Sequence, residues 1–152
     1  MTALVFVLGF TLVHAVAYTV AGAIALSFSR DLYAEKGRVL DFMRDMDDET
    51  ESLHVKRWFL PVQLVRGMLL AVVLLPILGP LGEATLLARF AFLFGAAVIW
   101  LDVASSVPFP NNLEGAVYLK PRYLRLSRHG KLYAETLLYG LLLAAPVAWL
   151  LF

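Results

Sequence analysis

Four stretches of the chain consist almost entirely of apolar residues, and charged residues gather between them. Each stretch has about 20 residues or more, which as an α-helix is long enough to cross a hydrocarbon core of about 30 Å. The pattern predicts an all-α integral membrane protein, a bundle of four transmembrane helices. The predicted spans are residues 2–28, 58–80, 84–104 and 132–152.

Composition supports the same class of protein. Hydrophobic residues make up 61% of the chain and charged residues only 16%, whereas soluble domains have about a quarter of charged residues. Because most of the 152 residues lie in the four spans, we expect a single transmembrane domain, residues 1–152. The absence of cysteine excludes disulfides, thiolate metal sites and a cysteine nucleophile.

Lysine and arginine are concentrated in two of the three connections between the spans. The tip around residues 79–83 has none, and neither does the segment before the first span. The positive-inside bias therefore predicts a multi-pass protein of the cell membrane, with loops 29–57 and 105–131 cytoplasmic and both termini on the other side. The basic residues that carry this prediction are Arg30, Lys36, Arg38, Arg44, Lys56, Arg57, Lys120, Arg122, Arg125, Arg128 and Lys131.

Each predicted span has one face of small or polar residues, which we expect to point toward the other helices because such residues allow close packing in a membrane. On the first span this face recurs at steps of three or four, and apolar Leu12, Val16, Val20 and Ile24 lie opposite. The four inward faces are Thr11, His14, Tyr18, Gly22, Ala25 and Ser29; Gln63, Arg66 and Gly67; Gly95, Ile99, Asp102 and Ser106; and Glu135, Tyr139, Leu142, Pro146 and Trp149.

Ionisable residues inside a span mark functional hypotheses, since a charge facing lipid is costly. Arg66, Asp102 and Glu135 all fall in the predicted cytoplasmic half. We therefore expect an ion pair between Arg66 and Asp102 or Glu135, lining a polar pocket open to the cytoplasm. The alternative is that Arg66 extends to the interface, the carboxylates are wetted and Lys131 pairs with Glu135.

Other polar and aromatic residues have structural explanations. His14 lies nearest the middle of the bilayer, where a neutral imidazole bonded to a backbone carbonyl of a neighbouring helix is the common use and a ligand or proton-carrying role is the alternative. Arg89 is expected to be an anchor at the far interface. Trp58, Trp100, Trp149 and Tyr123 are expected to be interfacial belt residues.

The first long loop contains an acidic segment at residues 45–51. It does not fit a calcium-binding EF-hand, because Thr50 stands where glycine is needed and Lys56 where the closing glutamate is needed. No metal site is predicted there. The apolar residues just before it predict a short interfacial helix resting on lipid headgroups, formed by Val39, Leu40, Phe42, Met43 and Met46.

The third loop, from Pro108 to Pro121, has the least generic composition. Its prolines, its Asn111–Asn112 pair and Gly115 favour a structured connector. Since it follows Asp102 directly, we expect it to lie over the mouth of the pocket and to contribute ligand contacts. The alternative is a turn that only joins two helices.

Two classes of function remain open. One is an accessory subunit or binding protein for a partner, a lipid or a hydrophobic ligand; the alternative is a small membrane enzyme or transporter using an intramembrane His, Arg and carboxylate site. The bilayer is the expected partner, with another membrane protein or a second copy also open, and nucleic acid is not expected. No pattern identifies catalytic residues or a cofactor. The candidate binding residues are His14, Tyr18, Gln63, Arg66, Asp102, Asn111, Asn112, Glu114, Tyr118, Lys120, Glu135 and Tyr139.

The predicted orientation is testable by labelling single cysteines, because the chain has none of its own. Cysteine at Thr2 or Gly82 should react with an impermeant thiol reagent from outside intact cells, and cysteine at Thr50 only after lysis. Labelling of the Thr50 variant in intact cells would show that the orientation is the reverse of the predicted one.

Overall fold

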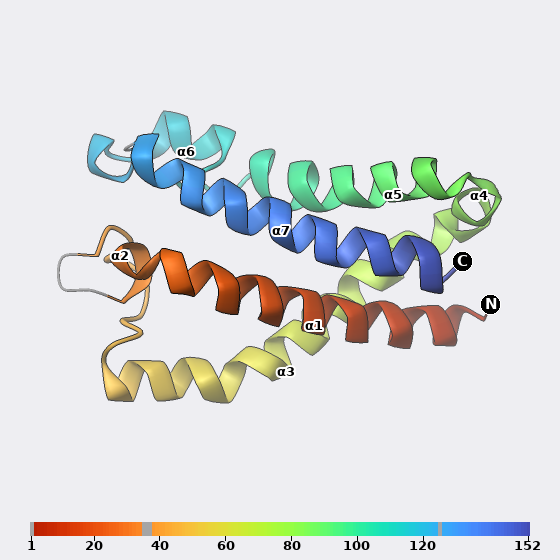
Figure 1. Cartoon of the computed structure of the whole chain (residues 1–152), viewed down its shortest axis with the longest axis horizontal. Coiled ribbons are helices and arrows are strands. Elements are labelled where there is room, and N and C mark those ends of the chain that lie inside the picture. Colours follow the sequence, from red (N-terminus) through yellow and green to blue (C-terminus); the bar gives the residue numbers. More distant parts are fainter. Residues whose placement is uncertain (1, 35–37, 125) are drawn as a thin grey trace.

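The computed structural model of the chain describes residues 2–34, 38–124 and 126–152, and these residues form helices and no strand. Four of the helical stretches are long and apolar enough to cross a membrane (Figure 1). The predicted all-α class with four such helices is therefore confirmed. The stretches are α1 (Ala3–Phe28); α3 (Glu49–Leu74), which continues through η1 (Leu75–Ile77) into α4 (Leu78–Glu83); α5 (Leu86–Gly95), which continues into the π-helix η2 (Ala96–Val103); and α7 (Leu126–Leu150).

The two long connections lie together at the end of the bundle opposite the two termini (Figure 1). They contain the short elements α2 (Arg30–Tyr33), α6 (Leu113–Tyr118) and η3 (Pro121–Tyr123). We call this the loop end of the bundle. Lys36 and Arg125, two of the basic residues used to predict orientation, lie outside the described residues.

α1 and α7 pack against each other in the middle of the bundle. α3 packs on α1, while α5 and η2 pack on α7, so the helices follow the order α3, α1, α7, α5. Neighbouring helices in this order run in opposite directions (Figure 1). α3 and η2 do not follow each other in this order, but both line the cavity described below.

α1 and α3 approach each other closely at Gly67. A Cβ atom at this position would lie 3.0 Å from the Thr11 Cα and 3.1 Å from the His14 Cδ2. Small residues allow this proximity, as the inward face of the first span predicted. The side of α1 predicted to lie opposite this inward face does point away from the other helices, since Leu12 is 63% and Val16 62% exposed.

The predicted inward face of the third span is wrong in its middle. Ile99 is 52% exposed, whereas Ala97 is 3% exposed. The reason is the π-helix η2, because hydrogen bonds from residue i to i+5 wind the chain more loosely than an α-helix and change which residues share a face. On α7 the prediction also fails near the end, where Trp149 is 74% exposed and Val147 is fully buried.

The short interfacial helix predicted in the first loop is absent from its predicted position, since the described residues 38–48 contain turns and bends but no helix. Val39 and Leu40 are buried in a small cluster with Leu32, Tyr123 and Leu132. Their apolar surface is thus used against the third loop and α7. Tyr123 is consequently not the interfacial belt residue that the sequence suggested.

Arg89, expected to be a surface anchor, is a buried tie between three segments. Its guanidinium donates to the backbone oxygens of Leu81 at 2.9 Å, Gly82 at 3.1 Å and Ala84 at 3.1 Å. It also donates to the Ala148 oxygen on α7 at 2.8 Å and lies 4.6 Å from the centre of the Phe152 ring. These carbonyls lie near the ends of α4 and α7, where no intrahelical donor remains. The Arg89 side chain therefore supplies hydrogen-bond donors to carbonyls at the ends of both helices.

We expect Arg89→Met to lower the free energy of unfolding by about 2 to 4 kcal/mol, because it removes a charged donor from several buried carbonyls. Unfolding in mixed detergent micelles measures the change. Arg57→Met is the matched control, since Arg57 is exposed and stacks on Trp58 of its own helix. Equal stability of the two variants would show that Arg89 is not a structural tie.

Candidate functional site

A cavity of about 690 Å³ lies between the four long helical stretches, in the half of the bundle nearest the loop end. On α1 its lining runs from Tyr18 to Leu26, and on α3 from Val55 to Arg66. Both stretches are on the loop side of the close contact at Gly67. The cavity therefore occupies the space that opens between α1 and α3 beyond their crossing.

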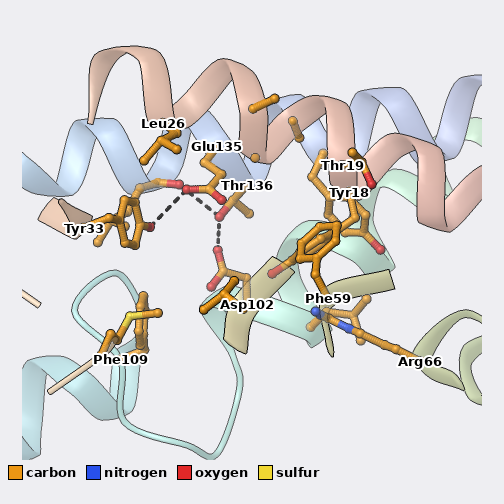
Figure 2. A pocket seen from close by; sticks show the side chains of 18 of the residues that line it. Tyr18, Thr19, Leu26, Tyr33, Phe59, Arg66, Asp102, Phe109, Glu135 and Thr136 are labelled. Carbon is orange, nitrogen blue, oxygen red and sulfur yellow. Dashed lines mark hydrogen bonds between the residues drawn. The ribbon is translucent and has the colours of Figure 1, made fainter. Parts of the chain in front are cut away.

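One wall of the cavity carries two carboxylates held by neutral donors (Figure 2). The Asn111 amide donates to Asp102 at 2.7 Å, and the Thr136 hydroxyl contacts the same carboxylate oxygen. The Tyr33 hydroxyl donates to Glu135 at 3.1 Å. Burial and the neighbouring Glu135 carboxylate raise the pKa of Tyr33 above its usual range, so Tyr33 remains a hydroxyl donor.

The π-helix is what brings Asp102 to this wall. Ala97 and Asp102 both line the cavity although they are five residues apart, a spacing that puts two residues on different faces of an α-helix at 3.6 residues per turn. In a π-helix, whose hydrogen bonds run from i to i+5, the same spacing keeps them on one face. π-Turns of this kind occur frequently at functional sites.

Arg66 lies on the opposite wall, on α3. Its guanidinium stacks 5.1 Å from the centre of the Tyr18 ring, and Figure 2 shows it extending from α3 toward Tyr18 and Phe59. Among the described residues no carboxylate oxygen lies within 4.0 Å of Arg66. The predicted ion pair with Asp102 or Glu135 is thus not formed here, although all three residues line the one cavity as expected.

Lys131 does not form the alternative pair with Glu135 either. Its ammonium lies 2.6 Å from Asp31, which joins the start of α7 to α2. The acidic residues of the first loop are engaged similarly, with Arg38 pairing with Asp45 at 2.8 Å. Within the described residues, no three His, Asp or Glu side chains are grouped closely enough to hold a metal ion.

Two predicted site residues, His14 and Gln63, do not line the cavity. They belong to a buried hydrogen-bonded group with Tyr139, which does line it. The His14 Nε2 lies 3.2 Å from the Gln63 Oε1 and its Nδ1 lies 2.8 Å from the Tyr139 hydroxyl. Because a carbonyl oxygen only accepts, this arrangement places the ring proton on Nε2 and lets Tyr139 donate to Nδ1. The fully buried imidazole therefore joins α1, α3 and α7 through side chains, where a bond to a backbone carbonyl was expected.

The third loop is ordered, but only its first part reaches the cavity. Phe109 and Asn111 line it. Asn112 is buried and caps α6, accepting from the Gly115 amide at 2.7 Å. A Cβ at position 115 would lie 1.8 Å from the Phe109 oxygen, so only glycine fits there. Of the predicted contact residues, Asn112, Glu114, Tyr118 and Lys120 are not among the lining side chains.

Several lining residues were not predicted from the sequence. Lys56 and Phe59 could have been found, because they precede Arg66 by ten and seven residues on the same face of α3. Thr136 follows the predicted Glu135 directly. Tyr33 had no local signal, since its role depends on how the first loop folds back over α7.

Comparisons of the chain with models of protein families, with curated proteins and with solved structures found no match.

The hydrogen bond between His14 and Tyr139 should appear as coupling in a double-mutant cycle. We expect His14→Leu and Tyr139→Phe to interact by about 0.6 kcal/mol, and by up to about 1.7 kcal/mol. Equilibrium unfolding in detergent supplies the four free energies. Thr19→Val combined with Tyr139→Phe is the control, since the Thr19 hydroxyl bonds to Ala15 of its own helix. If the coupling between His14 and Tyr139 is no larger than in this control, their hydrogen bond does not contribute to stability.

Proposed function

We propose that this chain is a small membrane-embedded binding protein that holds an amphiphilic ligand, such as a lipid, in the cavity between its helices. The observation that carries the proposal is the composition of the cavity wall. It is mostly apolar, with a few charged and hydroxyl groups from α3, η2 and α7. Pockets that bind small molecules are typically apolar with a few oriented polar groups, and about 300 to 1,000 Å³ in volume.

The outer surface of the bundle supports insertion in a bilayer. Large apolar side chains are exposed along all four stretches, among them Leu12 at 63%, Val73 at 74%, Leu87 at 76% and Leu141 at 49%. An apolar surface this extensive is rare on a soluble monomer and suits contact with lipid tails. Together with the distribution of basic residues, it supports a location of the loop end on the cytoplasmic side.

The packing order of the helices supports entry of a ligand from the bilayer. α3 is held by α1, and η2 by α7, yet both α3 and η2 line the cavity. An acyl chain entering between these two helices would cross no strongly packed interface. The charged groups would then meet the polar end of the ligand.

α6 is proposed to rest on the lipid headgroups, in place of the interfacial helix expected in the first loop. Its Leu113, Val117 and Tyr118 side chains are 64%, 73% and 70% exposed. Lys120 and Arg122 follow directly and are exposed as well. An apolar helix face with basic neighbours is the combination that binds an anionic membrane surface.

The enzyme or transporter alternative has less support. His14, the residue best suited to move a proton, is fully buried, does not line the cavity and is bonded on both ring nitrogens. Asp102 and Glu135 each have a neutral hydrogen-bond donor. These groups are better placed to hold the helices and a ligand than to carry out a reaction.

The proposal is tested by filling the cavity. Gly22 lines it, and a Cβ at this position would meet nothing within 4 Å. Gly22→Leu should therefore fold normally and lose most of the phospholipid that the wild type retains after detergent purification, measured by native mass spectrometry. Gly79→Leu is the control, because Gly79 also has free space but does not line the cavity. Equal retention by both variants, or no lipid on the wild type, would contradict the proposal.

A further inference from the structure

We infer that the ligand carries an anionic group, a phosphate or a carboxylate, which is bound by Arg66. This inference rests on the proposed function and names the chemistry of the ligand's polar end. It is carried by the juxtaposition of a guanidinium without an acceptor and two opposing carboxylates that already have donors, across one apolar cavity.

Arg66 has five N–H donors, and none of them makes a hydrogen bond within the described residues; its one specific contact is the Tyr18 ring. Arg89 shows what a satisfied arginine is like in the same protein, with four backbone oxygens around it. The fold thus supplies acceptors for the Arg89 guanidinium and leaves the Arg66 guanidinium facing the cavity.

The energetics favour an anion at this position. A cation stacked on an aromatic ring gains about 0.5 to 2 kcal/mol, but its hydrogen-bonding groups remain without acceptors in an apolar setting. A phosphate or carboxylate would satisfy them with charge-assisted, bidentate bonds, which arginine favours over lysine. The stacking on Tyr18 would also hold the guanidinium plane in place for such a contact.

The charges around the cavity fix the direction of the ligand. Lys56 lies on the same face of α3 and also lines the cavity, toward the loop end, so an anion would be attracted along the α3 wall. Asp102 and Glu135 repel an anion from the opposite wall. Hydroxyl or amine groups of the ligand are the complement of those two carboxylates.

The test compares ligands that share acyl chains and differ in charge. Delipidated protein in micelles of an uncharged detergent would be titrated with phosphatidic acid and with the matching diacylglycerol, with bound lipid measured by native mass spectrometry. The wild type should bind phosphatidic acid about tenfold to a hundredfold more tightly than diacylglycerol, the usual range for hydrogen bonds to a charged group. Arg66→Gln should lose this preference and still bind diacylglycerol.

Arg57→Gln is the matched control. Arg57 lies on the same helix and is exposed, and it does not line the cavity, so its loss should leave the preference unchanged. Thermal unfolding would show that both variants are folded. Arg66→Lys should retain part of the preference, because lysine keeps the charge without the bidentate fork.

The outcomes separate the two proposals. If both lipids bind equally to the wild type, or if Arg66→Gln keeps the preference, the inference about Arg66 is wrong and the cavity remains a lipid site. If neither lipid binds, the proposed function fails. If inorganic phosphate stabilises the wild type as much as phosphatidic acid does, and not Arg66→Gln, then Arg66 is an anion site whose natural ligand is a free anion.

Discussion

The contact of Gly67 with the backbone of Thr11 is the constraint on which the rest of the structure depends. It brings α1 and α3 together closely enough for His14 to meet Gln63, and through Tyr139 it joins both to α7. The main apolar core extends along the helices on both sides of this point. On the loop side they diverge and enclose the cavity. The close contact at Gly67 therefore marks the point along α1 and α3 beyond which the cavity begins.

Much of this arrangement was predictable from the sequence, because periodicity reports on helices reliably when a long segment has one face for lipid and one for protein. The α1 faces and the grouping of Arg66, Asp102 and Glu135 around one cavity followed from spacing alone. The π-helix could not be predicted from spacing, since a change in helix winding does not alter the composition of the segment. It moved Ile99 outward and Ala97 inward while still directing Asp102 into the cavity.

The other misjudged features depend on contacts between segments far apart in the sequence. Arg89 resembled an interfacial anchor because it begins a span, and only the positions of α4 and α7 reveal the carbonyls that surround it. Val39 and Leu40 resembled a lipid-facing surface because an apolar cluster near basic residues has that composition. Their actual partner, Tyr123, comes about 80 residues later in the chain.

The central place of α7 has a consequence for the order in which the protein is assembled. Tyr139, Thr136 and the Ala148 oxygen all belong to this helix, and they are the partners of His14, Asp102 and Arg89. During synthesis the first three helices emerge before any of these partners exists. Until α7 has been made, His14, Asp102 and Arg89 therefore lack these hydrogen-bond partners. Assembly of this fold is therefore completed only after translation has passed α7.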